Sequence, residues 1–202
     1  MEYLIICSLW IAYCAFHSFL ISIKFTNIVS RVLKNYYAFY RLFYIIISLV
    51  LLIPLIQYSD SLSGKILVEY SSPWSAVRIV LMYGSLLLFF WAFFFDYDAL
   101  SFFGIRQIMN FGKTSVVNAS DTIKKKGLLG IIRHPMYLAL IVYLWTQTFQ
   151  LKDILINTIL TAYVIIGTYL EERKLVLEFG DAYVKYQHEV PMLIPFIKPK
   201  TA

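Results

Sequence analysis

The stretch FYRLFYIIISLVLLIPLIQ occupies residues 39–57 and carries a single charge, on Arg41. A helix needs roughly 20 predominantly apolar residues to cross the hydrocarbon core of a bilayer. The whole chain has the same character, because 60% of its 202 residues are hydrophobic and only 15% are charged. An ordinary soluble domain has about 25% charged residues. The sequence therefore predicts an all-α, polytopic membrane protein.

Four further apolar stretches flank this one, over residues 3–23, 76–95, 135–149 and 154–170. Together they predict a single integral membrane domain, residues 1–202, with about five transmembrane helices. Its expected parts are three N-terminal spans, a cytosolic loop, a helical hairpin and a cytosolic tail, over residues 1–95, 96–134, 135–170 and 171–202. The hairpin is expected because only residues 150–153 separate the last two spans.

Lysine and arginine are distributed unevenly between the loops. Fifteen of the 18 lie in the loop after the first span, the loop after the third span and the tail, and the others are Lys65, Arg78 and Lys152. Cytoplasmic loops carry an excess of basic residues. We therefore expect the N-terminus outside and the C-terminus in the cytosol, as in a bacterial inner membrane. Basic residues in such loops contact anionic membrane lipid, and their confinement there argues against nucleic-acid binding.

The segment GLLGIIRHPMY, residues 127–137, carries the first candidate functional residues. Pro135 suits the first turn of a helix, where its missing N–H costs nothing. Arg133 and His134 then lie at the mouth of the fourth span, and Tyr137 lies just inside it. A simple interpretation makes them an orientation charge, an interfacial polar residue and part of an aromatic belt.

A tight hairpin would return Glu171 and Glu172 to the level of Arg133 and His134. Charged residues at this depth usually face a cavity or one another. One interpretation is therefore a salt bridge from Arg133 that closes the hairpin. The other is a water-accessible pocket with both signs of charge, which would suit a zwitterionic ligand that also carries an adenine.

The tail is amphipathic from Glu171 onward. Its apolar residues recur at steps of three and four, as in a helix that lies on or against the membrane face: Leu175, Val176, Phe179, Tyr183 and Tyr186. Aromatic rings of this stripe could face a sulfonium cation. Three prolines, from Pro191 onward, prevent further regular helix.

Several of these motifs, taken in order, resemble the isoprenylcysteine carboxyl methyltransferase superfamily over residues 124–196. They are Arg133-His134-Pro135-Met136-Tyr137, the pair Glu171-Glu172, and the segment from Phe179 to Tyr186 that is followed by Val190-Pro191. The first half resembles the NnrU and methanethiol S-methyltransferase branch. Its matching segments are FHS at 16–18, YRLFY at 40–44 and LSFFGIRQ at 100–107.

The resemblance implies S-adenosylmethionine as a methyl donor bound at the cytosolic side. It assigns cofactor contact to Arg133, His134, Tyr137 and Glu172, with Arg133 and Glu172 also catalytic; Glu171, Tyr183 and Tyr186 are further cofactor-binding candidates. The sequence departs from the family where Leu128 and Leu129 replace an aromatic residue and Ala139 replaces glycine.

The predicted function is methyl transfer to a small-molecule thiol or a lipidic acceptor, and the first-half resemblance favours the thiol. Two alternatives remain, a membrane reductase that uses a nicotinamide cofactor and a non-catalytic NnrU-like membrane protein. The sequence has no Gly-x-Gly-x-x-Gly, so a soluble Rossmann methyltransferase is not expected. It has no metal-ligand cluster either, because its three histidines are far apart.

The sequence leaves the roles of three polar residues open. His17 lies within the first span, where a histidine is either a functional group or an interhelical hydrogen-bonding residue. Asp96 and Asp98 end the third span, where they either contact a substrate or are solvated.

Overall fold

The structure is a computed structural model in which residues 1–111 and 125–197 are described. It divides into two compact units. Unit 1 comprises residues 1–68, 99–116 and 149–160, and unit 2 comprises residues 69–98, 117–148 and 161–202. Helices make up nearly all of the described structure, so the all-α class is confirmed, with one short antiparallel pair of strands in addition.

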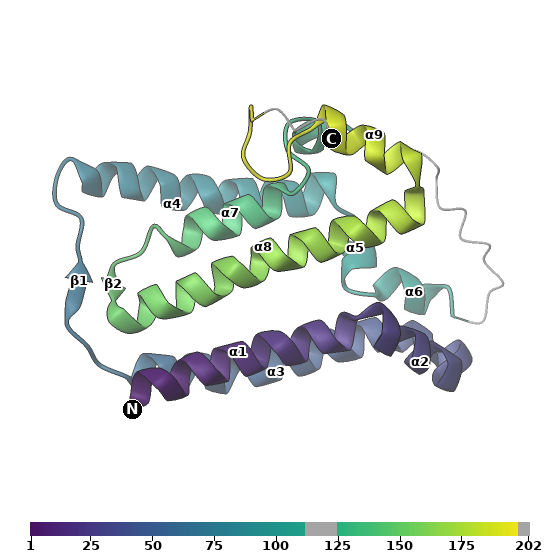
Figure 1. The fold of residues 1–202 in the computed structure, drawn as a ribbon, viewed down its shortest axis with the longest axis horizontal. Helices are drawn as coiled ribbons and strands as arrows, with labels where there is room; N and C mark the ends of the chain where they lie inside the picture. Colours follow the sequence, from purple (N-terminus) through teal and green to yellow (C-terminus); the bar gives the residue numbers. More distant parts are fainter. Residues whose placement is uncertain (112–124, 198–202) are drawn as a thin grey trace. The chain divides into compact units, whose positions relative to one another are not determined.

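Unit 1 is built on α1 (Glu2–Ile21) and α3 (Tyr40–Ser61), which lie side by side (Figure 1). They are joined by α2 (Ile23–Leu33) and a 3-10 turn, Lys34–Phe39. The core of unit 1 contains Ile6, Trp10 and Leu55. The indole nitrogen of Trp10 donates a hydrogen bond to the hydroxyl of Ser59 over 3.1 Å, which ties α1 to α3.

The strands of unit 1 are β1 (Ile66–Val68) and β2 (Phe149–Gln150), which pair antiparallel. Directly after β2 begins α8 (Leu151–Phe179), the longest helix described. The ammonium of Lys152 is buried and donates to the carbonyl of Ser59 over 2.7 Å. This bond fixes the first turn of α8 against the end of α3.

Unit 2 contains α4 (Trp74–Trp91), which continues as a π-helical turn, Ala92–Asp96. The helix α7 (Pro135–Leu144) packs along it (Figure 1). A 3-10 turn, Gly127–Gly130, precedes α7. Gly180 separates α8 from α9 (Asp181–Glu189). The loop expected over residues 96–134 also contains α5 (Ala99–Phe102) and α6 (Ile105–Met109) in unit 1, and its residues 112–124 lie outside the described residues.

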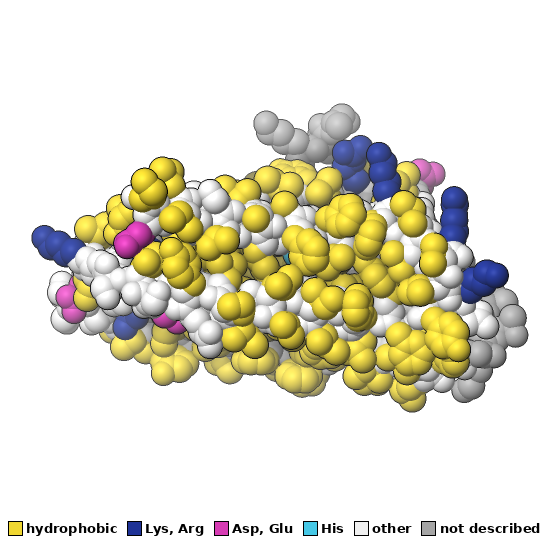
Figure 2. Space-filling view, turned by 90° about the horizontal axis from the view of Figure 1, so that it is seen from below, with side chains coloured by type: hydrophobic (Ala, Val, Ile, Leu, Met, Phe, Trp, Pro, Cys, Tyr) yellow, Lys and Arg dark blue, Asp and Glu magenta, His cyan; other side chains and the backbone are white. Residues whose placement is uncertain are grey.

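Four described helical stretches are long and apolar enough to cross a membrane: Glu2–Ile21, Ile23–Ser61, Trp74–Asp96 and Leu151–Phe179. The fifth expected span differs, because α7 ends at Leu144 and has 10 residues. At 1.5 Å per residue it extends about 15 Å, half of the hydrocarbon thickness. Hydrophobic side chains cover most of the face drawn in Figure 2, as expected of helices surrounded by lipid. The part of the chain that the structure describes thus has four long candidate membrane helices and a short apolar one.

The tail differs from the single surface helix that its pattern predicts. Gly180 adopts a positive φ of 57°, and the chain turns there between α8 and α9. The expected apolar stripe folds onto itself: Tyr183, Tyr186 and Val190 are buried, and Leu175, Val176 and Phe179 pack against them. The two tyrosine rings meet edge to face, with centroids 5.7 Å apart. The stripe is therefore used in packing within the tail.

Candidate functional site

The start of α7 is held in place by the segment that follows α9. Pro135 occupies the first helical position, as its fixed φ favours. The two residues before it donate their backbone N–H groups to this segment, Arg133 to the carbonyl of Pro191 over 2.9 Å and His134 to that of Met192 over 3.1 Å. Both side chains are thereby placed beside the last turns of α8.

The side chains of Arg133 and Glu172 form a two-pronged ion pair. Nε of Arg133 donates to Oε1 of Glu172 over 2.5 Å, and Nη2 donates to Oε2 over 2.8 Å. The two side chains are 6% and 7% exposed. The third nitrogen, Nη1, donates to the carbonyls of Gln187 and Val190 at the end of α9. A planar guanidinium suits this arrangement, because its fork matches a carboxylate in two parallel bonds.

Glu172 accepts from three further groups. These are Nε2 of His134 at 3.1 Å, Nε2 of Gln187 at 3.0 Å and the hydroxyl of Tyr183 at 3.4 Å. Its carboxylate therefore joins the start of α7 to α9 as well as to α8. The structure brings Arg133 and Glu172 together as the salt-bridge interpretation of the sequence expected.

His134 and Glu171 keep hydrogen-bonding capacity. When Nε2 of His134 donates to Glu172, the neutral ring presents Nδ1 as an acceptor. That Nδ1 is buried and has no hydrogen-bond partner among the described residues, and it lies 4.0 Å from Oε2 of Glu171. Tyr137 donates to the same Oε2 over 2.7 Å, and its ring stacks on His134 with centroids 5.4 Å apart. The Glu171 side chain is 39% exposed.

Two tyrosines of α9 border this cluster. Burial raises the pKa of Tyr183, and the negative charge of Glu172 raises it further. Burial likewise raises the pKa of Tyr186 to about 12. The hydroxyl of Tyr186 donates to the carbonyl of Leu129 over 2.6 Å. Both phenols are therefore neutral hydrogen-bond donors at physiological pH, and their rings are taken up by packing.

Two residues near the cluster were not candidates on sequence grounds. Gln187 in α9 donates a hydrogen bond to Glu172. No sequence pattern indicates this contact. Tyr97 follows the π-helical turn of α4, and burial raises its pKa, with further contributions from Glu171, Tyr186 and Asp96. These charges show that Tyr97 is within electrostatic reach of the cluster. Its position beside two aspartates at the end of a predicted span was the available signal.

Asp96 ends the π-helical turn that follows α4 and is partly exposed. Its Oδ2 is buried and has no hydrogen-bond partner among the described residues. Gly127 has a φ of 65°, and a Cβ at that position would overlap Oδ1 of Asp96. The turn Gly127–Gly130 is thus built around this carboxylate.

The first-half motifs lie in unit 1 and pack against one another. Nε of Arg41 donates to the carbonyl of Phe102 over 3.0 Å. Gly104 has a φ of 79°, and a Cβ there would lie 2.9 Å from Cβ of Arg41. The ring of His17 lies between those of Tyr13 and Tyr44, with centroid distances of 6.3 and 6.4 Å. These contacts join α1, α3 and α5.

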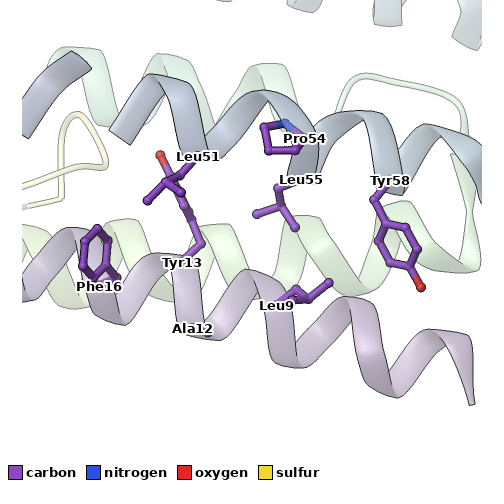
Figure 3. Close-up of a pocket in the computed structure, with 8 residues that line it drawn as sticks. All are labelled: Leu9, Ala12, Tyr13, Phe16, Leu51, Pro54, Leu55 and Tyr58. Carbon is purple, nitrogen blue, oxygen red and sulfur yellow. The ribbon is translucent and has the colours of Figure 1, made fainter. Parts of the chain in front are cut away.

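A cavity of about 360 Å³ lies between α1 and α3 (Figure 3). It is lined by apolar side chains and two tyrosines: Leu9, Ala12, Tyr13, Phe16, Leu51, Pro54, Leu55 and Tyr58. Because no charged residue lines it, it offers nothing to hold a zwitterionic ligand. The candidate site is therefore the polar cluster of unit 2.

The sequence is similar to several methanethiol S-methyltransferases, as its motifs predict. It is 32% identical over 94 residues to one from Pseudomonas sp., a match that covers 46% of this chain and 36% of the relative. Methanethiol S-methyltransferase 1 of Bradyrhizobium diazoefficiens is 34% identical over 133 residues, or 63% of this chain and 45% of the relative. The enzyme of Crocosphaera subtropica is 30% identical over 100 residues, 49% of this chain and 39% of the relative.

These matches span less than half of the length of each relative. No family model matches the sequence, and no solved structure matches it.

Proposed function

We propose that this chain transfers a methyl group from S-adenosylmethionine to a small thiol. The likeness to the methanethiol S-methyltransferases carries this proposal. The long apolar helices support an integral membrane protein, in which an apolar acceptor can arrive through the bilayer. The proposed orientation keeps the polar cluster of unit 2 on the cytosolic side, where the cofactor is.

The cluster divides into a supporting pair and a ligand-facing pair. Arg133 and Glu172 are assigned to cofactor contact and catalysis by the family resemblance, but their charges are turned toward each other. We assign them the positioning of His134 and α9. The groups with capacity left for a ligand are the carboxylate of Glu171 and Nδ1 of His134. Tyr137 orients both, through its hydrogen bond and its ring.

These residues fit the donor groups of S-adenosylmethionine. The cofactor carries an ammonium, ribose hydroxyls and an adenine amine, each of which donates hydrogen bonds. Glu171 is exposed enough to receive the ammonium or a hydroxyl. Nδ1 of His134 can accept one more donor in the tautomer that carries its proton on Nε2. When bound, the cofactor supplies a methyl group already activated by its sulfonium. The chain's own contributions would be alignment of the acceptor and exclusion of water.

The test uses the full chain in lipid nanodiscs. Binding of labelled S-adenosylmethionine is measured for the unmodified protein, for Glu171→Gln and for Glu178→Gln, a matched change at an exposed position of α8. We expect binding to weaken by about tenfold or more in Glu171→Gln, because a charge-assisted bond is lost, and to be unchanged in Glu178→Gln.

Methyl transfer to methanethiol is followed as release of the volatile thioether. The proposal is wrong if the nanodisc protein binds a reduced nicotinamide in preference to S-adenosylmethionine. It is also wrong if the cofactor binds but no thiol is methylated.

A further inference from the structure

The helix α2 lies between two helices that are each long enough to cross a bilayer. α1 has 20 residues and α3 has 22, so at 1.5 Å per residue they extend about 30 and 33 Å, as the hydrocarbon core requires. α2 has 11 residues and extends only about 16 Å. Hydropathy merges it with α3 in the stretch Ile23–Ser61, but α3 needs no extension to cross. Because α1 ends where α2 begins and α3 follows it, α2 lies at one membrane surface (Figure 1).

α2 is a separate helix with its own boundaries. Ser22 is extended, with a ψ of 143°, and its hydroxyl oxygen accepts a hydrogen bond from the N–H of Phe25 over 3.3 Å, as an N-cap does. One side of the helix then packs within unit 1. The ring of Phe25 lies against those of Phe19 in α1 and Tyr40 in α3, with centroid distances of 4.4 and 6.4 Å. These contacts fix which side of α2 faces outward.

The outward side of α2 carries an apolar row beside a basic row. Ile28 and Val32 are one turn apart and are 58% and 72% exposed. Lys24 and Arg31 are two turns apart on the same face, and both are exposed. Lys24 precedes Ile28 by four residues and Arg31 follows it by three, so the two rows adjoin. A helix with this pattern lies in the plane of the interface, with its apolar row in the acyl boundary.

The charge around α2 has one sign. Residues 22–44 and 99–111 of unit 1 contain lysine and arginine but no aspartate or glutamate. The second range reaches the turn that follows α2, because the ring centroid of Phe111 lies 5.6 Å from that of Tyr36. Within residues 1–111 and 125–197, no ion pair engages Lys24 or Arg31. A negatively charged partner is therefore complementary to this surface, and anionic lipid headgroups supply that charge at a membrane.

We propose that α2 is an interfacial helix that binds the headgroups of anionic phospholipids. Ile28 and Val32 enter the boundary between headgroups and acyl chains, while Lys24 and Arg31 extend from the border of that row to the phosphate oxygens. Tyr36 in the next turn is exposed, and tyrosine is enriched at this depth because its ring is amphipathic. In the orientation proposed above this surface faces the cytosol, where the leaflet carries the anionic lipids.

The test uses the full chain in nanodiscs, with a fluorophore on Val32→Cys and both native cysteines changed to alanine. Quenching is measured with phosphatidylglycerol and with phosphatidylcholine that carry a spin label on the acyl chain, each diluted into phosphatidylcholine. Each basic residue near an anionic headgroup contributes about fivefold in affinity. We expect both lipids to quench, and phosphatidylglycerol to do so at a mole fraction about tenfold lower. A fluorophore on Asn27→Cys, on the polar side of α2, should be quenched weakly by both.

Matched variants of the labelled protein assign the preference to the basic row. Lys24→Gln with Arg31→Gln should bring the two lipids to within about twofold of each other, because both charges are lost. Lys24→Arg with Arg31→Lys keeps both charges and should retain the preference. Lys65→Gln removes an exposed charge beyond the opposite end of α3 and should have no effect. In about 1 M salt the Debye length is about 3 Å, so the preference of the protein with its basic row intact should weaken.

Equal quenching by the two lipids, or a preference that survives Lys24→Gln with Arg31→Gln, would overturn the proposal. An absence of quenching at position 32 would overturn it too, and cross-linking of that cysteine between two chains would then identify a second copy as the occupant. If the double variant does not fold, the salt dependence of the protein with its basic row intact decides the question. A preference that is unchanged in about 1 M salt would refute binding by charge.

Discussion

The ion pair between Arg133 and Glu172 allows a stability prediction with a defined magnitude. The change is Glu172→Ala, which removes the carboxylate and leaves the guanidinium in place. Besides Arg133, it takes a hydrogen-bond partner from His134, Gln187 and Tyr183. The variant should therefore loosen α9 from the start of α7.

The magnitude follows from the burial of the pair. Each of the two charge-assisted bonds is worth about 1.5–3 kcal/mol. Because both side chains are more than nine-tenths buried, the remaining guanidinium is an uncompensated buried charge, and such losses cost about 3–5 kcal/mol. Arg133 keeps its bonds to the carbonyls of Gln187 and Val190, which favours the lower half of this range. We expect the free energy of unfolding to fall by about 3–4 kcal/mol.

The assay is equilibrium unfolding in mixed micelles, in which a denaturing detergent is titrated and tryptophan fluorescence is followed. Glu178→Ala is the control, since it shortens an exposed glutamate of the same helix. Trypsin gives a local readout, because Lys185 lies in α9 and should become cleavable when α9 is released. The double variant Arg133→Met with Glu172→Leu removes both charges, and we expect it to recover at least half of the loss.

A loss in Glu172→Ala that lies within about 1 kcal/mol of the control would refute this reasoning. The pair would then contribute no more than an exposed one. A double variant as unstable as the single one would also contradict it, because the cost would not come from the unpaired charge.

Three further predictions concern single groups. Tyr186→Phe should lower the free energy of unfolding by about 1–2 kcal/mol, measured as above, because the carbonyl of Leu129 loses its donor. Gly104→Ala should cost about 2–4 kcal/mol, since its φ is positive and its Cβ would press on Arg41, whereas Gly84→Ala, with open space around it, should cost less. The folded-state pKa of Tyr186, about 12, is raised above the unperturbed value of 10.0. Its stabilisation is therefore complete below pH 10 and is lost as the pH rises through about 12, which the difference in tyrosinate absorption between the unmodified protein and Tyr186→Phe should report.

Hydropathy alone predicted the four long helices, because each contains a continuous apolar run that decides its structure. It could not predict the end of α7 at Leu144, since residues 145–149 still include apolar side chains. After that helix the chain forms β2, which pairs with β1, more than 80 residues earlier. Such a pairing depends on tertiary contacts that leave no periodic pattern.

The sequence predicted a cluster of opposite charges around Arg133, but not which glutamate would pair with it. The hairpin argument placed two glutamates near Arg133 without choosing between them. Neighbouring residues on a helix point about 100° apart, so only one of the pair can face the guanidinium. The phase of α8 selects Glu172 and leaves Glu171 partly exposed. The roles of Gln187 and Asp96 depend on the turn at Gly180 and the turn at Gly127, which sequence periodicity does not reveal.

The bonds from Arg133 to the end of α9 have a consequence for the order of biosynthesis. Arg133 leaves the ribosome 57 residues before Val190, whose carbonyl it binds. At 5–20 residues per second this interval is roughly 3–11 s. During it the guanidinium must remain hydrated or find a temporary partner, such as a lipid phosphate. A nascent chain that stops short of Val190 can therefore insert its helices, but it lacks the hydrogen bonds between Arg133 and the end of α9 that help to place His134 beside Glu171.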